Sequence, residues 1–147
     1  MTKGPEKPAW RDVLERCGLQ VVEEEARSGP PVRSALYAVT GMEVGPVATI
    51  PASSPGATAA LDETWHLHAS GASLYDDEGE FLILPPVPGG SEIGWVRVRD
   101  TAGTPLPSRI AGVTGSPEFV TVSADGRHLC AASVEEYDYW VVLHEFS

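Results

Sequence analysis

The chain has 147 residues, of which 21 are Asp or Glu and 10 are Lys or Arg, so its formal net charge is −11. This length suits one domain, which can bury a sizeable core without disulfides or a structural metal. The acidic balance argues against binding to nucleic acid or to an anionic membrane surface, because both require clustered cations.

The sequence also argues against a membrane or secreted protein. No apolar run approaches the roughly 20 residues of a membrane span. The basic start of the chain lacks the apolar segment of a secretory signal. Cys17 and Cys130 are the two cysteines, too few for a disulfide framework or a cysteine-based zinc site. We therefore expect a cytoplasmic protein that needs no cofactor.

Two helices are predicted. A flexible N-terminal arm, residues 1–8, precedes apolar residues at i, i+3, i+4 and i+7 from Trp10, which predict a helix at about residues 8–17. A second helix is expected at about residues 55–69. It is preceded by a Ser-Pro pair, a favourable N-cap and first turn, and it is closed by Gly71.

Short β-prone segments fill the rest of the chain. Strands are expected at residues 19–24, 34–40, 43–50, 72–75, 81–84, 95–99, 119–122, 128–133 and 137–146. Two hairpins are expected, one joining 72–75 to 81–84 and the other joining 119–122 to 128–133. Arg97 and Arg99 alternate with apolar residues, so both should lie on one face of their strand.

The connections between these strands decide the fold class. All are too short for a parallel crossover, except the one that contains the second helix. Residues 119–142 resemble one strand–turn–strand unit of a β-propeller, but a propeller needs at least four such blades, so the resemblance supports an antiparallel meander. We predict an α+β fold: a single domain over residues 9–147 with a curved, mostly antiparallel sheet of about eight strands and two helices.

The acidic residues are unevenly distributed along the chain. Residues 34–96 contain no Lys or Arg but hold Glu43, Asp62, Glu63, Asp76, Asp77, Glu78, Glu80 and Glu92. Such a segment either solvates the surface or forms a docking surface for a basic partner, whose approach the charge would steer. Acidic and aromatic residues also meet near the C-terminal end. The candidate partner-binding residues are Asp76, Asp77, Glu78, Glu80, Glu135, Glu136, Tyr137 and Asp138.

His66 and His68 are the alternative candidates, as metal ligands. On a strand they would point the same way, which is similar to the two-histidine signature of cupins, and residues 79–90 are similar to part of the second cupin motif. However, no Glu follows His68 at the required spacing, and Ile93 stands where the last His would be. On a helix the two side chains lie about 200° apart and cannot share an ion. We expect no metal site, with His68 packed beside Trp65 and His66 facing solvent.

Cys130 is the other candidate for chemistry. Contact of Cys130 or Cys17 with His128 or His144 would form a Cys–His pair, although an isolated intracellular cysteine such as Cys130 is more often a small core residue. We assign no catalytic residue.

These observations favour a non-catalytic acidic interaction module of the bacterial cytoplasm, of the immunity or antitoxin kind, that covers a basic surface of a partner protein. The alternatives are a small metal- or ligand-binding β-roll enzyme with His66, His68 or His128 around a pocket, and a structural subunit of a larger assembly.

Overall fold

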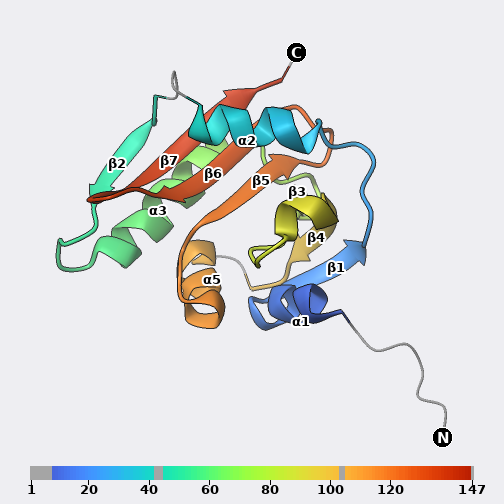
Figure 1. The fold of residues 1–147 in the computed structure, drawn as a ribbon, viewed down its shortest axis with the longest axis horizontal. Helices are drawn as coiled ribbons and strands as arrows, with labels where there is room; N and C mark the ends of the chain where they lie inside the picture. Colours follow the sequence, from blue (N-terminus) through green and yellow to red (C-terminus); the bar gives the residue numbers. More distant parts are fainter. Residues whose placement is uncertain (1–7, 42–44, 103–104, 147) are drawn as a thin grey trace, which may run out of the picture.

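The computed structural model describes residues 8–41, 45–102 and 105–146. Within these ranges, seven strands form one open antiparallel sheet in the order β1-β4-β3-β5-β6-β7-β2 (Figure 1). The strands are β1 (Leu19–Glu23), β2 (Ala48–Pro51), β3 (Glu80–Ile83), β4 (Val96–Asp100), β5 (Phe119–Ser123), β6 (His128–Val134) and β7 (Asp138–Glu145). The predicted α+β class and mostly antiparallel sheet are confirmed. The predicted N-terminal arm lies outside the described residues, apart from Pro8.

Five helices accompany the sheet in the described part of the chain: α1 (Ala9–Arg16), α2 (Val32–Thr40), α3 (Ala57–Gly71), α4 (Gly90–Ile93) and α5 (Leu106–Thr114). The two predicted helices are confirmed as α1 and α3, while α2, α4 and α5 were not expected. The strand predicted at residues 34–40 is wrong, because this segment forms α2. Its buried residues, Ala35 and Val39, lie one helical turn apart. Residues four apart also share one face of a strand, so this short apolar segment does not distinguish a helix from a strand.

One predicted hairpin is also wrong. Residues 72–75 form no strand, because the chain leaves α3 through a turn in which Ser73 has a φ of 59°. Strand β3 pairs with β4 and β5 instead. The other predicted hairpin is confirmed as β5 and β6. The strand predicted at 43–50 is present only as β2, and its residues 43 and 44 lie outside the described ranges.

The helices cover the two faces of the sheet unequally. Residues of α1, α3 and α5 pack with Phe81, Ile83 and Val98 on one face, in the larger of two cores. On the other face α2 packs over Leu82, Val122 and other strand residues, and Figure 1 shows α2 and α3 on opposite sides of the sheet.

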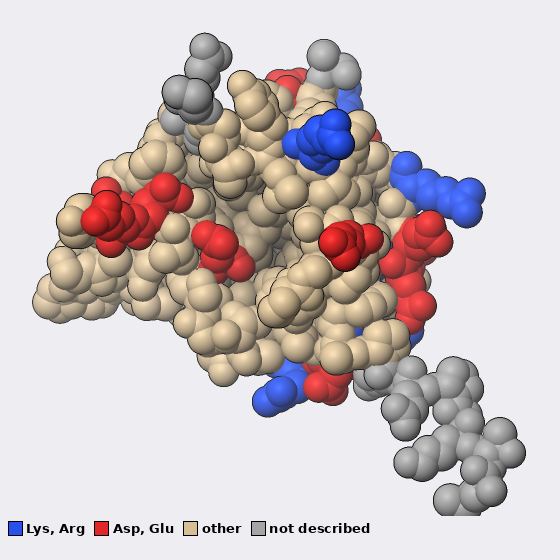
Figure 2. Space-filling view, in the orientation of Figure 1, with Lys and Arg blue, Asp and Glu red and all other residues tan. Residues whose placement is uncertain are grey.

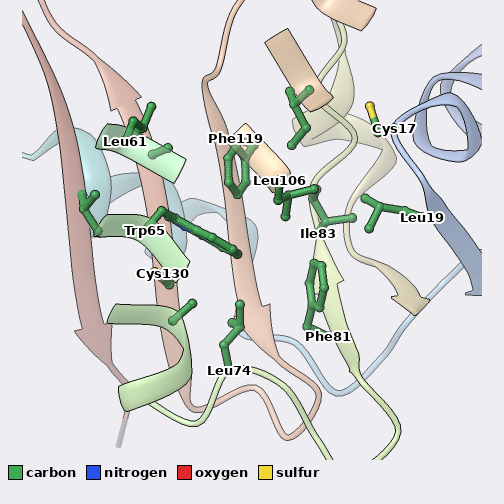
Figure 3. Close-up of a cluster of buried hydrophobic side chains, with 14 of the residues drawn as sticks. Cys17, Leu19, Leu61, Trp65, Leu74, Phe81, Ile83, Leu106, Phe119 and Cys130 are labelled. Atoms are coloured by element: carbon green, nitrogen blue, oxygen red, sulfur yellow. The ribbon is translucent and has the colours of Figure 1, made fainter. Parts of the chain in front are cut away.

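Trp65 of α3 is at the centre of the larger core. Its ring lies 5.1 Å from that of Phe119 and 6.3 Å from that of Tyr75, both in edge-on contact. Figure 3 shows Trp65 extending from α3 toward the start of β5. Edge-on aromatic contacts add to the hydrophobic effect of burying such large rings. No helix in the described ranges is both long enough and apolar enough to cross a bilayer.

The turn between β5 and β6 packs closely against the loop that precedes α2. Gly126 has a φ of 79°, and a Cβ at this position would lie 2.1 Å from the carbonyl oxygen of Ser28. The Ser28 hydroxyl donates a hydrogen bond to the Ala124 carbonyl, 2.8 Å away. Only glycine fits this turn without moving the loop.

Replacing Gly126 with Ala should lower the free energy of unfolding by about 1–3 kcal/mol, because the new Cβ meets backbone and φ is positive. Gly112→Ala is the matched control. It lies within α5 with no neighbouring atom within 4 Å of its Cβ position, and it should stabilise by about 0.5–1 kcal/mol. Urea unfolding of both variants measures the change in the free energy of unfolding. Equal effects of the two substitutions would contradict the close packing of the turn.

Candidate functional site

The first group of predicted partner-binding residues, at the start of β3, forms a turn closed by Asp76. Its Oδ1 accepts hydrogen bonds from the backbone N–H groups of Glu78 and Glu80, at 2.9 and 2.8 Å. The Glu80 side chain, only 3% exposed, accepts hydrogen bonds of 2.6 Å from Arg97 Nε and from Arg99 Nη2. The prediction that both arginines lie on one face of their strand is therefore confirmed.

These and two further ion pairs neutralise most of the negative charge of the turn. Arg97 also pairs with Asp76 at 3.2 Å, and Arg99 with Glu78 at 3.4 Å. The hydrogen bond from Arg97 is the main reason that the pKa of the Glu80 carboxyl lies below its ordinary value. Asp77 is exposed and makes no ion pair with another described residue. The turn is thus an internal ion-pair network between β3 and β4, with one carboxylate left for solvent.

Asp62 is a second acid used inside the fold. Its side chain is only 8% exposed. It accepts hydrogen bonds from the backbone N–H of Ser108, at 2.8 Å, and from the Ser108 hydroxyl. The N-cap residue of α5, Pro105, makes no side-chain cap, so Asp62 of α3 satisfies an N–H group in the first turn of α5. The cation-free segment therefore does not form a single acidic face.

The histidines expected as alternative metal ligands both lie on α3, so their side chains point apart. His66 is half-buried rather than solvent-facing, with its ring 6.0 Å from that of Tyr75 and its Nδ1 buried without a partner. It borders an open cavity of about 490 Å³ between α3 and Pro105. Asp62 also lines this cavity, where its carboxylate accepts the hydrogen bond from the Ser108 hydroxyl and so serves as the cap of α5. Among the described residues, no three His, Cys, Asp or Glu side chains gather as a metal site.

Among the described residues, no hydrogen bond joins Cys130 to a histidine. It is fully buried, and burial raises the pKa of its thiol, as it does for Cys17. In the register of β6 and β7, Leu129 lies opposite His144, which places His144 on the other face of the sheet from Cys130. Both cysteines are core residues, which confirms the prediction for Cys130.

The second group of predicted partner-binding residues, near the C-terminal end, is partly exposed. Residues 134–138 form the β6–β7 tip, the turn that joins the two long C-terminal strands. Tyr137 is 74% exposed and Val134 is 41% exposed. Glu136 is exposed beside them, while Glu135 and Asp138 are half-buried. Figure 2 shows acidic side chains gathered at this end of the molecule.

Several hydrogen bonds hold the β6–β7 tip in place. The Glu135 N–H donates to the Asp138 carbonyl at 2.8 Å, and the Ser133 hydroxyl donates to the Glu135 carboxylate. The Tyr137 carbonyl accepts from the Ala52 N–H at 2.9 Å, next to edge strand β2. The Val134 N–H donates to Glu118 Oε2, also at 2.9 Å. Tyr137 is therefore displayed on an ordered backbone.

The two acidic groups lie at opposite ends of the strands. Glu80 begins β3, and the neighbouring Phe81 pairs with Ser123 at the end of β5. Strand β6 begins beside that end, at His128, and it reaches the β6–β7 tip only after its full length. One partner contact at the tip would not include Asp77.

An apolar groove on the α2 side of the sheet had not been predicted. It has a volume of about 380 Å³ and is lined by Leu36, Leu84, Val87, Ser91, Glu118 and Val120, among others. We call it the α2–β5 groove. Figure 2 shows a hollow at this place, between α2, α4 and β5, with acidic side chains on both sides. The proline-rich loop was visible in the sequence, but α2, its opposite wall, was predicted as a strand.

The chain matches no model of a known protein family, and no significant similarity to curated proteins or to solved structures was found.

Replacing Glu80 with Gln should lower the free energy of unfolding by about 2 kcal/mol at pH 7, because two charge-assisted hydrogen bonds are weakened at a buried site. Glu145→Gln is the control. Its pair with Arg127 is largely exposed, so the loss should stay below about 1 kcal/mol. Denaturant unfolding measures the free energy of unfolding of both variants. Equal losses of stability would contradict a special role of Glu80.

The same pair gives a prediction for pH. The pKa of Glu80 is lowered by folding from its ordinary value of 4.5, so its contribution to stability is complete above that pH. It is lost as the pH falls through the lower pKa of the folded state. The stability of the wild type should therefore fall more steeply in acid than that of Glu80→Gln. Parallel pH profiles from thermal unfolding would contradict this.

Proposed function

We propose that this protein is a non-catalytic module of the bacterial cytoplasm that binds a basic surface of a partner protein through the β6–β7 tip, as immunity and antitoxin proteins do. The observation that carries the proposal is Tyr137, an aromatic side chain 74% exposed among acids on an ordered turn. Exposed tyrosines on rigid backbone are typical anchors of protein interfaces.

The geometry of the tip supports binding with little loss of conformational freedom. The hydrogen bonds from Val134, Glu135 and Ala52 already order the backbone that carries Tyr137. Association then requires ordering of few side chains, which leaves more of the interaction energy as affinity.

The charge supports a basic partner. The whole chain carries −11, and Glu136 is exposed directly beside Tyr137. An acidic surface attracts a basic partner over distances near the Debye length and raises the association rate. The same charge disfavours nucleic acid as a partner.

The two cysteines agree with the proposed compartment. Cys17 and Cys130 are both buried as free thiols, the state that is usual for cysteines of the reducing cytoplasm. No contact among the described residues favours the metal-binding alternative, in which His66 and His68 would be ligands.

Tyr137→Ala should abolish most of the binding. We expect affinity capture from the native host to return one basic protein with the wild type and with Tyr37→Ala, but not with Tyr137→Ala. Tyr37 is a suitable control because it is 66% exposed on α2, away from the tip. In titrations with the captured protein, loss of the anchor should weaken Kd about 30-fold, a cost of about 2 kcal/mol.

Salt provides the second readout. The association rate should fall as ionic strength rises from about 0.05 to 0.3 M, because salt screens the steering field. Equal weakening by Tyr37→Ala and Tyr137→Ala, or a captured partner with an acidic surface, would refute the proposal.

A further inference from the structure

The α2–β5 groove is large enough for one bulky side chain and offers it apolar walls. Leu36 and Val120 are half-buried on two of its sides, and Val87 is half-buried in the loop between β3 and α4. Leu84 is buried there. Covering these side chains with an apolar group would remove further apolar surface from water.

Glu118 joins this groove to the β6–β7 tip. It is exposed, it lines the groove, and its Oε2 accepts the hydrogen bond from the Val134 N–H at 2.9 Å. Its other carboxylate oxygen accepts no hydrogen bond from a described residue. A cation could pair with this oxygen without releasing the tip. The groove and the tip therefore form one continuous surface, with Glu118 at its middle.

The charges around the groove define its occupant. Glu118 is the single charged side chain among its described lining residues, and the exposed Glu92 is next to Ser91 of the lining. Arg33, on α2, lies three residues before Leu36. A cation of the occupant is favoured on the Glu118 side and disfavoured on the Arg33 side. A second copy of this chain would bring another −11 to the surface.

We propose that the α2–β5 groove receives an apolar side chain from an exposed segment of the basic partner, with a neighbouring Lys or Arg of that segment paired to Glu118. This inference rests on the proposed function and adds the chemistry of the partner segment: a large apolar residue next to a cation. The groove and Tyr137 then contact the partner at two places.

The test uses the full chain and a random dodecapeptide phage library as the probe. Panning should enrich peptides in which Leu, Ile, Phe or Trp lies next to Lys or Arg. A synthetic copy of the most enriched peptide is then titrated against the variants by fluorescence anisotropy.

Two variants isolate the groove. Ser91→Arg places a long cationic side chain at the groove wall from an exposed position and should weaken the peptide Kd at least tenfold. Ser70→Arg is the matched control, with the same change of charge at an exposed site of α3 on the other side of the sheet, and it should change Kd less than twofold. Glu118→Gln keeps an oxygen for the Val134 N–H but loses the charge, and it should weaken Kd several-fold.

The outcomes separate this inference from the proposed function. Peptides that lose binding with Tyr137→Ala but not with Ser91→Arg would refute the groove and leave the tip proposal standing. Loss with Ser91→Arg but not Tyr137→Ala would support the groove alone. No enrichment, enriched peptides without cations, or equal loss with Ser70→Arg would overturn the inference, as would a wild-type dimer that Ser91→Arg dissociates.

Discussion

The packing of Trp65 against Phe119 is the contact on which most of this structure depends. It holds α3 against the sheet at the start of β5, with ring centroids 5.1 Å apart. With α3 in that place, Asp62 reaches the first turn of α5 and fixes the helix through Ser108. The chain leaving α5 then enters β5 past Glu118. Loss of the Trp65 ring would therefore move both the core and one wall of the α2–β5 groove.

The net charge of this chain does not describe its surface. Several carboxylates are used inside the fold: Glu80 pairs with two arginines, and Asp62 caps a helix. Glu136, at the β6–β7 tip, lies in water beside Tyr137. Buried and paired acids contribute to the stability of the fold, whereas exposed acids set the electrostatic field that an approaching molecule meets. Position, more than number, decides which acids can act on a partner.

The parts predicted correctly from sequence are those whose contacts are local or periodic. Helix α3 was predicted in the right place, although it begins at Ala57 after Gly56 and not at the Ser-Pro pair. The β5–β6 hairpin has a short glycine turn. Alternation placed Arg97 and Arg99 on one face, but their partner Glu80 follows from the β3–β4 register, which alternation does not specify. The groove needs α2, the loop after β3 and β5 together. Because α2 was predicted as a strand, the prediction lacked one wall of the groove, and the groove could not be foreseen.

The two buried thiols make the chain its own reporter of local opening. A thiol-modifying reagent can reach Cys130, in a central strand, when the core between α3 and the sheet opens. It can reach Cys17, at the end of α1, when that helix lifts from α5 and β1. Two labelling rates measured in native buffer would thus give the free energies of two separate opening events.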